Sequence, residues 1–171
     1  MNAKMNAKQG GFTLVELIVV IIILGILAAI ALPRFANLQT QARIAKLNAA
    51  VGAVKGASAI AHGQCLVTPT CVDAGFSLPM EGADVATVNK YPTADSVALG
   101  AASTGIALAA GLTISTTEGY DTTGGGAGAG AILTIRVLGG SDPSTCSFTY
   151  QAPAAAGSAP VFGAPQTAGC T

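Results

Sequence analysis

The sequence predicts an α+β protein in which a long N-terminal helix packs on a small antiparallel sheet. Three observations lead to this fold class. An apolar run covers residues 12–32, and helix-forming residues continue to about His62. The rest of the chain is rich in glycine, threonine, serine and proline, with alternating segments typical of strands. The expected segments are residues 1–11, 12–33, 34–62 and 63–171.

The composition excludes several classes of protein. Of the 171 residues, 51% are hydrophobic and only 9% are charged, whereas soluble domains carry about 25% charged residues. Eight basic and eight acidic side chains give a net charge of zero, which argues against a nucleic-acid binder. Because the chain has no tryptophan and one histidine, a conventional polar active site is hard to build. We therefore expect neither an enzyme nor a cofactor.

The apolar run has the length of a membrane helix. Residues 12–32 contain one charged side chain, Glu16, and Leu17–Leu32 contains no polar side chain. As a helix, a run of this length extends about 30 Å, enough to cross the hydrocarbon core of a bilayer. The many isoleucines and valines are also typical of a buried strand, but the length without turn residues favours the membrane helix.

The segment before this run differs from a secretory signal. Residues 1–11 are hydrophilic and carry Lys4 and Lys8, and the small pair Gly10–Gly11 precedes the apolar run. A secretory signal has its small-residue cleavage site after the apolar region. Cleavage after Gly11 would remove a basic leader and keep the helix on the mature chain. The basic leader is expected to stay cytoplasmic, which places the downstream domain outside.

A specific motif surrounds this cleavage point. The run Gly11–Glu16 reads GFTLVE and is followed by about 16 apolar residues. It resembles the processing site of type IV prepilins and pseudopilins. The resemblance implies the pilin fold, with the first half of the helix protruding from the globular part and a disulfide loop near the C-terminus. It also implies cleavage between Gly11 and Phe12 by a prepilin peptidase, followed by methylation of the Phe12 amine.

Shorter segments narrow the resemblance. They are similar to the mannose-sensitive haemagglutinin branch of type IVa pilins. These segments are Pro33–Gln39, Ala42–Arg43, Tyr91–Ala94 and Ala109–Leu112.

Glu16 has two interpretations. A carboxylate at the centre of a membrane helix costs about 2.5–3.5 kcal/mol on insertion scales, and less near a helix end. In one interpretation Glu16 lies at the membrane surface among headgroups. In the other it pairs with an amine, and the resemblance implies the Phe12 amine of a neighbouring subunit. Such a pair would set the axial register of one helix on the next more than it would stabilise the assembly.

Gly25 and Pro33 are the weak points of the apolar helix. Pro33 lacks an N–H group, so the carbonyl of Ala29 loses its partner and a kink is expected. Glycine in a helix interior costs about 1 kcal/mol relative to alanine. A simple kink is one interpretation. The resemblance implies another, in which the stretch between Gly25 and Pro33 loses helicity in the filament.

The second part of the helix carries two apolar stripes. A surface helix of a monomer needs only one. We expect the larger stripe to pack on the protein's own sheet and the alanine-rich stripe to contact another helix. A coiled-coil dimer is the rival interpretation, but the repeat is short and charged flanking positions are lacking. The larger stripe is Ile44, Leu47, Val51 and Val54, and the other is Phe35, Leu38, Ala42, Ala45 and Ala49.

The globular part is predicted from shorter patterns. A short helix is expected to begin at Pro92 and run to Ala110, and a glycine-rich loop covers Gly119–Gly130. Cys146, Phe148 and Tyr150 alternate on one face of the last strand, as in a half-buried strand. The expected strands are Leu112–Thr117, Ala131–Leu138 and Ser144–Gln151, with a turn at Gly139–Pro143 before the last.

Four cysteines follow the membrane segment: Cys65, Cys71, Cys146 and Cys170. Export favours disulfides, and four cysteines allow three connectivities. We favour Cys65–Cys71 and Cys146–Cys170 because each closes a local loop. In type IV pilins a C-terminal disulfide loop bounds an exposed variable surface, so the resemblance adds weight to the second pair. A zinc site is the rival interpretation, but no Cys-x-x-Cys unit is present and only His62 could assist.

Other candidate sites carry weaker signals. Gly126-x-Gly128-x-x-Ala131 loosely matches a dinucleotide fingerprint, but a strand rather than a helix is expected to follow it. His62 has no evident nucleophile or orienting acid beside it. Aromatic residues of the long helix are explained by packing without an electron-transfer ladder. The acids Asp73, Glu81, Asp84 and Asp95 match no calcium loop, so no metal site is expected.

The sequence thus predicts the major structural subunit of a type IV pilus. The expected partners are other copies of the chain, the inner membrane before assembly, the prepilin peptidase, the pilus assembly machinery and a surface or host receptor. The extracellular filament would serve adhesion and further roles such as twitching motility or DNA uptake. The alternatives are a pseudopilin of a type II secretion system and, in another class, a membrane-anchored enzyme or sensor.

Overall fold

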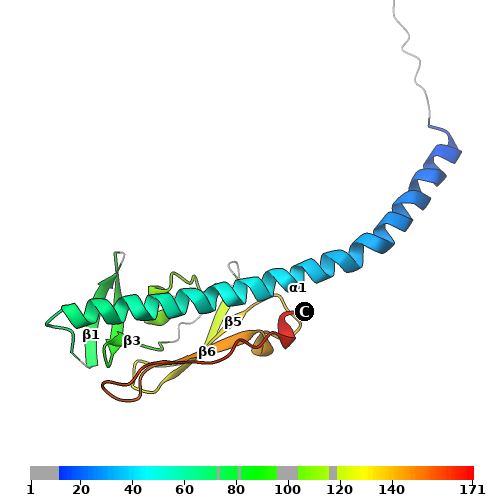
Figure 1. Cartoon of the computed structure of the whole chain (residues 1–171). Helices are drawn as coiled ribbons and strands as arrows, with labels where there is room; N and C mark the ends of the chain where they lie inside the picture. Colours follow the sequence, from blue (N-terminus) through cyan, green and yellow to red (C-terminus); the bar gives the residue numbers. More distant parts are fainter. Residues whose placement is uncertain (1–11, 73, 81, 96–103, 116–118) are drawn as a thin grey trace, which may run out of the picture. The chain divides into compact units, whose positions relative to one another are not determined.

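The computed structural model describes residues 12–72, 74–80, 82–95, 104–115 and 119–171 (Figure 1). The chain divides into two compact units, Met1–Leu38 and Gln39–Thr171. One helix, α1, runs through both. Each unit is described by itself below.

Helix α1 spans Leu14–Val67 and has 54 residues. It ends five residues beyond the predicted end at His62. The backbone of Thr68 precedes Pro69, and a residue before proline is biased away from the helical conformation. The Thr68 hydroxyl donates a hydrogen bond to the carbonyl of Gln64 (2.8 Å), which satisfies one of the open carbonyls of the last turn.

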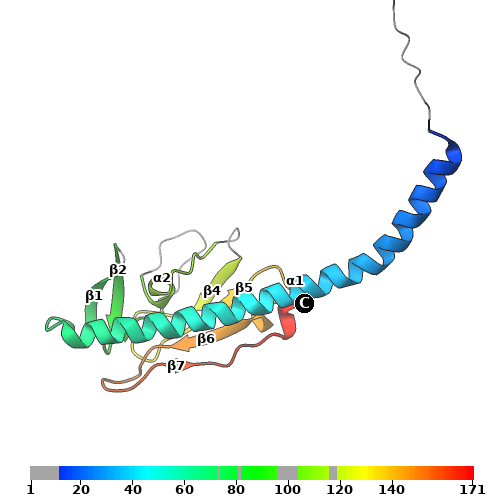
Figure 2. The ribbon, with the colours of Figure 1, turned by 45° about the horizontal axis from the view of Figure 1, so that its top comes forward.

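The second unit contains two antiparallel sheets rather than the single sheet that we expected. The two sheets follow one another along α1, with β1–β3 beside its last turns (Figures 1 and 2). The first sheet has the order β1-β2-β3 and consists of β1 (Ala74–Met80), β2 (Ala83–Val88) and β3 (Tyr91–Pro92). The second has the order β4-β5-β6-β7 and consists of β4 (Tyr120–Gly124), β5 (Ile132–Val137), β6 (Ser147–Gln151) and β7 (Val161–Phe162). Short helical turns lie at α2 (Ile106–Ala109), η1 (Pro143–Thr145) and η2 (Ala168–Cys170).

The turn between β2 and β3 has an unusual composition. Val88 pairs with Tyr91, so the turn has two central residues, Asn89 and Lys90. Both have positive φ, 50° and 66° respectively, as in a type I′ turn. Asparagine is common at such positions, but the second one usually holds glycine. A lysine there costs about 1–2 kcal/mol relative to its right-handed conformation.

The core lies between α1 and the second sheet. Leu47 and Val54 of α1 are fully buried together with Ile135, Phe148 and Tyr150. The larger helical stripe therefore packs on the protein's own sheet, as predicted, and Phe148 and Tyr150 of β6 are buried together with Cys146, the residue directly before that strand. The whole arrangement confirms the α+β fold class.

Tyr150 connects the two sheets. Its hydroxyl donates a buried hydrogen bond to the carbonyl of Pro92 in β3 (2.7 Å). Burial raises the pKa of this hydroxyl above its ordinary value of 10.0. The phenol is therefore held in its neutral, donating form.

Several predicted boundaries in the globular part were wrong. The region predicted as a loop contains β4. This strand was not predicted because the glycines on both sides of it are typical of a loop. Tyr120, Thr122 and Thr123 are strand-forming types, and Asp121, which is not, forms an ion pair with Arg136 across the β4–β5 pair. The strand predicted to begin at Ser144 is β6 and begins at Ser147, because Pro143 starts a 3₁₀ turn in which the Asp142 side chain accepts a hydrogen bond from the Ser144 amide (2.9 Å).

The predicted helix and strand between residues 92 and 117 were also wrong in the part that the structure describes. Pro92 belongs to β3, and α2 is the only helix found among the described residues of this stretch. Residues 96–103 and 116–118 lie outside the described residues. In the predicted strand, Ser115 forms an isolated bridge with Tyr120. A helix of four residues and a bridge of a single residue pair are both too short to leave a periodic pattern in the sequence. Neither could therefore be predicted from periodicity.

Candidate functional site

The first half of α1 presents a continuous apolar surface. Every large hydrophobic side chain from Phe12 to Leu38 is exposed in this chain. The most exposed is Phe12, at 87%. The helix is long and apolar enough to cross a membrane. Since a monomeric soluble protein rarely exposes such a surface, we infer that lipid or another protein covers it.

The first turn of this helix is closed by a capping box. The Glu16 amide donates a hydrogen bond to Thr13 Oγ1 (3.2 Å). In return the Thr13 amide and hydroxyl both donate to Glu16 Oε2, at 3.0 and 2.8 Å. The two residues thus satisfy amides that would otherwise lack partners at a helix N-terminus.

Thr13 is the helix-capping residue that the sequence patterns did not lead us to single out. Its signal is present, because a threonine three residues before a glutamate and ahead of an apolar run is the signature of a capping box. The interpretation of Glu16 considered only its charge. Gly11 lies outside the described residues, and the pairing of Glu16 with a neighbouring Phe12 amine stays a prediction.

Gly25 and Pro33 both lie inside α1, which is helical through both positions. A Cβ atom added at Gly25 would meet nothing within 4 Å. Gly25 therefore has no steric reason for lacking a side chain in the isolated chain. Loss of helicity between these residues stays a prediction about the packed state.

The second half of α1 has one buried and one exposed face. Ala42, Ala45 and Ala49 of the alanine-rich stripe are exposed. Further along this half, Gly52 and Gly56 have open space where a side chain would be. The exposed face thus leaves room for another backbone to approach closely, and contact of this stripe with another helix stays a prediction.

Two disulfides lie in the second unit. The structure joins Cys65 with Cys71 and Cys146 with Cys170, with Cα–Cα distances of 5.4 and 4.9 Å. These are the pairs that the sequence analysis favoured over a zinc site. The first closes the end of α1, and the second attaches the C-terminal turn η2 to the start of β6.

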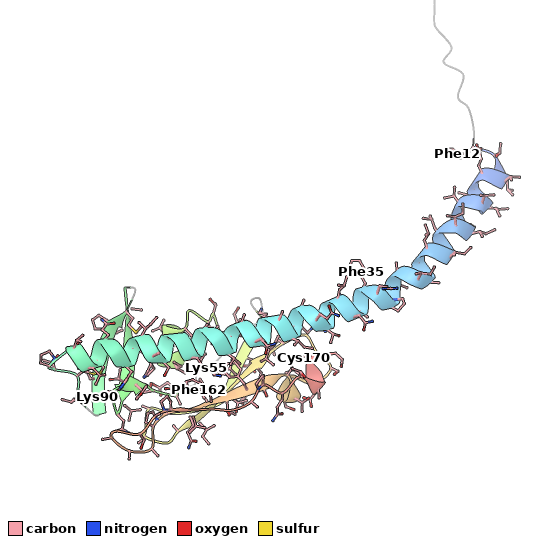
Figure 3. All side chains as sticks on the ribbon, in the orientation of Figure 1. Phe12, Phe35, Lys55, Lys90, Phe162 and Cys170 are labelled. Carbon is pink, nitrogen blue, oxygen red and sulfur yellow. A yellow bond between two sulfur atoms is a disulfide. The ribbon has the colours of Figure 1, made fainter. Side chains whose placement is uncertain are left out.

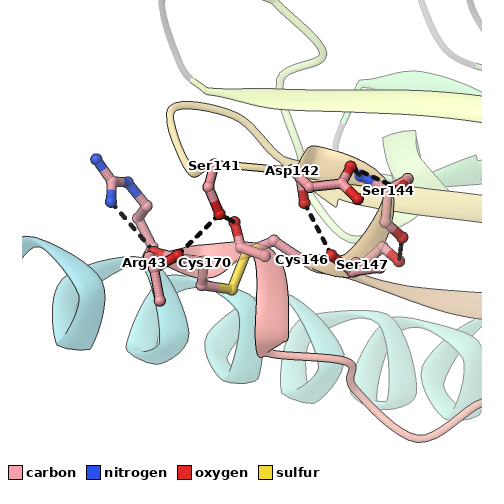
Figure 4. Close-up of a disulfide and its surroundings, with 10 residues drawn as sticks. Arg43, Ser141, Asp142, Ser144, Cys146, Ser147 and Cys170 are labelled. Carbon is pink, nitrogen blue, oxygen red and sulfur yellow. Dashed lines mark hydrogen bonds between the residues drawn. A yellow bond between two sulfur atoms is a disulfide. The ribbon is translucent and has the colours of Figure 1, made fainter.

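Hydrogen bonds hold the C-terminal segment around the second disulfide (Figure 4). Arg43 Nη1 of α1 donates to the carbonyl of Cys170 (3.1 Å). The Ser141 amide donates to the carbonyl of Thr171 (2.7 Å), and the Asp142 amide to that of Gly169 (3.2 Å). The C-terminal loop is therefore fixed both to α1 and to the turn before β6.

The remaining candidate side chains form no metal cluster within the described ranges. Asp84 is exposed, while Asp95 accepts hydrogen bonds from Thr93 and Thr104, each at 3.0 Å. Asp73 and Glu81 lie outside the described residues. The glycine-rich segment after β4 leads into the strand β5, so its context does not match that of a dinucleotide fingerprint.

Comparisons with known proteins agree with the motif. A family model described as the prokaryotic N-terminal methylation motif matches residues 6–32. The type IV narrow pilus major component PilA5 of Thermus thermophilus is 51% identical over 78 residues, which cover 46% of this chain and 65% of that protein. The fimbrial protein EcpB of Eikenella corrodens is 50% identical over 58 residues, 33% of this chain and 36% of that protein.

A longer match involves the type IV major fimbrial protein FimA of Dichelobacter nodosus. It is 32% identical over 104 residues, which cover 53% of this chain and 67% of that protein. The chain thus spans between about a third and two thirds of the length of these curated relatives. No solved structure matches the chain.

Proposed function

Because the chain belongs to the type IV pilin family, we propose that it is the major structural subunit of a type IV pilus. The proposed role is structural and not enzymatic. Copies polymerise through the N-terminal helix into an extracellular filament. The names of the relatives, which include a narrow pilus major component and major fimbrial proteins, support this proposal.

The observation that carries the proposal is the exposed apolar half of α1. Before assembly, the inner membrane covers this surface. In the filament, the same surface of other copies covers it. Lipid tails are as apolar as leucine, so the transfer from membrane to filament gains little hydrophobic free energy. Close helix packing and polar pairing between helices must therefore supply the preference for the filament.

Processing precedes assembly in this proposal. Prepilin peptidase cleaves between Gly11 and Phe12 and the new Phe12 amine is methylated. Cleavage leaves Thr13 as the second residue of the mature chain, so the capping box with Glu16 survives it. The assembly machinery then moves the subunit from the membrane into the filament.

The Phe12 amine and Glu16 form the polar pair between neighbouring subunits. A carboxylate and an amine are each costly inside an apolar bundle but neutralise one another when paired. Only one axial position of the neighbouring helix forms the pair, so it fixes the register. The stretch between Gly25 and Pro33 loses helicity on packing and allows the filament to extend under load.

The globular unit then forms the outer wall of the filament. The loop closed by Cys146–Cys170 bounds an exposed surface for adhesion. Twitching motility and DNA uptake are further roles of such a filament. A pseudopilin of a type II secretion system is the alternative, but the reported relatives are pilus and fimbrial proteins.

Electron microscopy of surface filaments, followed by mass spectrometry of their subunit, tests the proposal. The expected result is a fibre whose subunit begins at methylated Phe12. A protein confined to the cell envelope, with no fibre and an uncut leader, would contradict it.

Two variants of Glu16 test the register pair. Glu16→Val and Glu16→Gln should both insert into the membrane and form at least tenfold fewer filaments, because neither carries the charge. Asp84→Ala removes an exposed acid outside α1 and serves as the control. Normal filament yield from Glu16→Val would refute the proposed pairing of Glu16 with the Phe12 amine of a neighbouring subunit. It would not affect the proposal that the chain is a pilus subunit.

A further inference from the structure

A cavity of about 340 Å³ lies beside the C-terminal end of α1. Three segments that are far apart in the sequence line it. They are His62 and Leu66 of α1, the Asn89–Tyr91 turn, and residues 156–158 before β7. Its volume is near the lower end of the range for small-molecule sites, about 300–1,000 Å³, and suits a ligand with a single ring.

The three walls are linked to one another. His62 Nδ1 donates to the carbonyl of Lys90 (3.1 Å), and the His62 and Tyr91 rings stack with centroids 4.0 Å apart and planes within 3°. Asn89 Nδ2 donates to the carbonyl of Pro153 (2.9 Å). Helix and turn are thus held together before any ligand binds, and the turn is also bonded to the chain three residues before the third wall, which lowers the entropy cost of binding.

Lys90 is the one lysine among the residues that line this cavity. It lies on the β2–β3 turn beside the last turns of α1 (Figure 3). Its φ of 66° favours glycine. A lysine at this position therefore adopts a backbone conformation that is unfavourable for a residue with a side chain. The residues that line the cavity include no carboxylate. The lining residues therefore include one lysine and no acid, and a backbone outlier of this kind is typical of ligand sites.

We propose that this cavity binds a small carboxylic acid whose carboxylate is carried on a six-membered ring. The ring packs against the wall formed by His62 and Tyr91, and the carboxylate pairs with Lys90. The Asn89 amide and the Ser158 hydroxyl are the polar groups available to ring hydroxyls. This chemistry is shared by sugar acids and hydroxylated aromatic acids. Binding does not depend on filament assembly.

Saturation-transfer NMR on the full-length protein in detergent micelles tests the proposal. Glucuronate and 4-hydroxybenzoate represent the two sources, and glucose is the neutral match of the first. At least one acid should bind with a dissociation constant of about 1 mM, a value ordinary for so small a ligand, and glucose should bind at least tenfold more weakly. The acid that binds more tightly identifies the source.

Lys90→Gly separates binding from folding. Glycine suits the positive φ, so the variant should have an equal or higher melting temperature and yet bind the acid at least tenfold more weakly. Lys90→Asn, which also tolerates this backbone, provides a second neutral variant. Lys46→Gln, on α1 outside the cavity, is the control and should bind like the wild type. Equal binding of glucose, unchanged binding by Lys90→Gly, or no binding of either acid at 10 mM would each overturn the proposal.

Discussion

The two disulfides should stabilise the fold unequally, because they close loops of different length. Cys146 and Cys170 are separated by 24 positions, which makes a closed loop of 25 residues, whereas Cys65 and Cys71 are separated by 6, a loop of 7. The chain-entropy relation gives about 3.5 kcal/mol for the longer loop and about 2.3 kcal/mol for the shorter one.

Two double variants test this difference, and in each one both cysteines of one disulfide are replaced by alanine. All four cysteines are buried, with exposed fractions between 0 and 6%, so the cavities left by the lost sulfurs destabilise the two double variants by similar amounts. The difference between the variants therefore isolates the loop term. We expect Cys146→Ala/Cys170→Ala to lose about 1 kcal/mol more free energy of unfolding than Cys65→Ala/Cys71→Ala.

Urea unfolding of the full-length protein in detergent micelles measures this difference through tyrosine fluorescence. The chain has three tyrosines and no tryptophan, and all three tyrosines lie in the second unit. Limited proteolysis should also release the C-terminal segment sooner from the variant without Cys146–Cys170. Equal losses, or a larger loss without Cys65–Cys71, would refute the loop-entropy reasoning.

Two further predictions concern hydrogen bonds. Thr13→Val removes the hydroxyl of the capping box with Glu16 and should destabilise the first helical turn by about 1 kcal/mol; hydrogen exchange of the Glu16 amide should quicken, while Thr13→Ser keeps the wild-type rate. Tyr150→Phe leaves the Pro92 carbonyl without its buried donor and should cost about 1–3 kcal/mol at pH 7. Because burial raises the folded-state pKa of Tyr150 above 10.0, the wild type keeps its full stability below pH 10 and loses it as the pH rises further. Thermal melts between pH 8 and 11 should show a shallower decline for the phenylalanine variant, and an equal decline would contradict the assignment.

The sequence predicted those parts of the fold that have a long local period. The apolar run and the stripe with Leu47 and Val54 are spread over many helical turns, and the alternation around Phe148 covers a whole strand. Each pattern reports one buried face. These elements became α1 and β6 in the structure.

Elements that tertiary contacts stabilise were not predicted. β1 contains Gly75 and Pro79, two residues depleted in strands, and pairs with β2 through a register shift. β3 has two residues, and one of them is Pro92, whose carbonyl accepts the bond from Tyr150. A contact across 58 positions has no local signature in the sequence. For the same reason the cavity at Lys90 could not be foreseen, since its walls come from three separate segments.

Glu16 shows how the cap and the proposed register pair fit together on one side chain. Both bonds that Thr13 donates to this carboxylate end on Oε2, which leaves Oε1 outside the cap. A carboxylate has about four lone-pair sites on its two oxygens, so an amine from a neighbouring helix need not displace Thr13. The cap instead restricts the rotamer of Glu16 before a partner arrives. Restriction of this kind lowers the entropy cost of forming the pair, and it gives a physical reason why threonine precedes glutamate by three positions in a segment that is otherwise apolar.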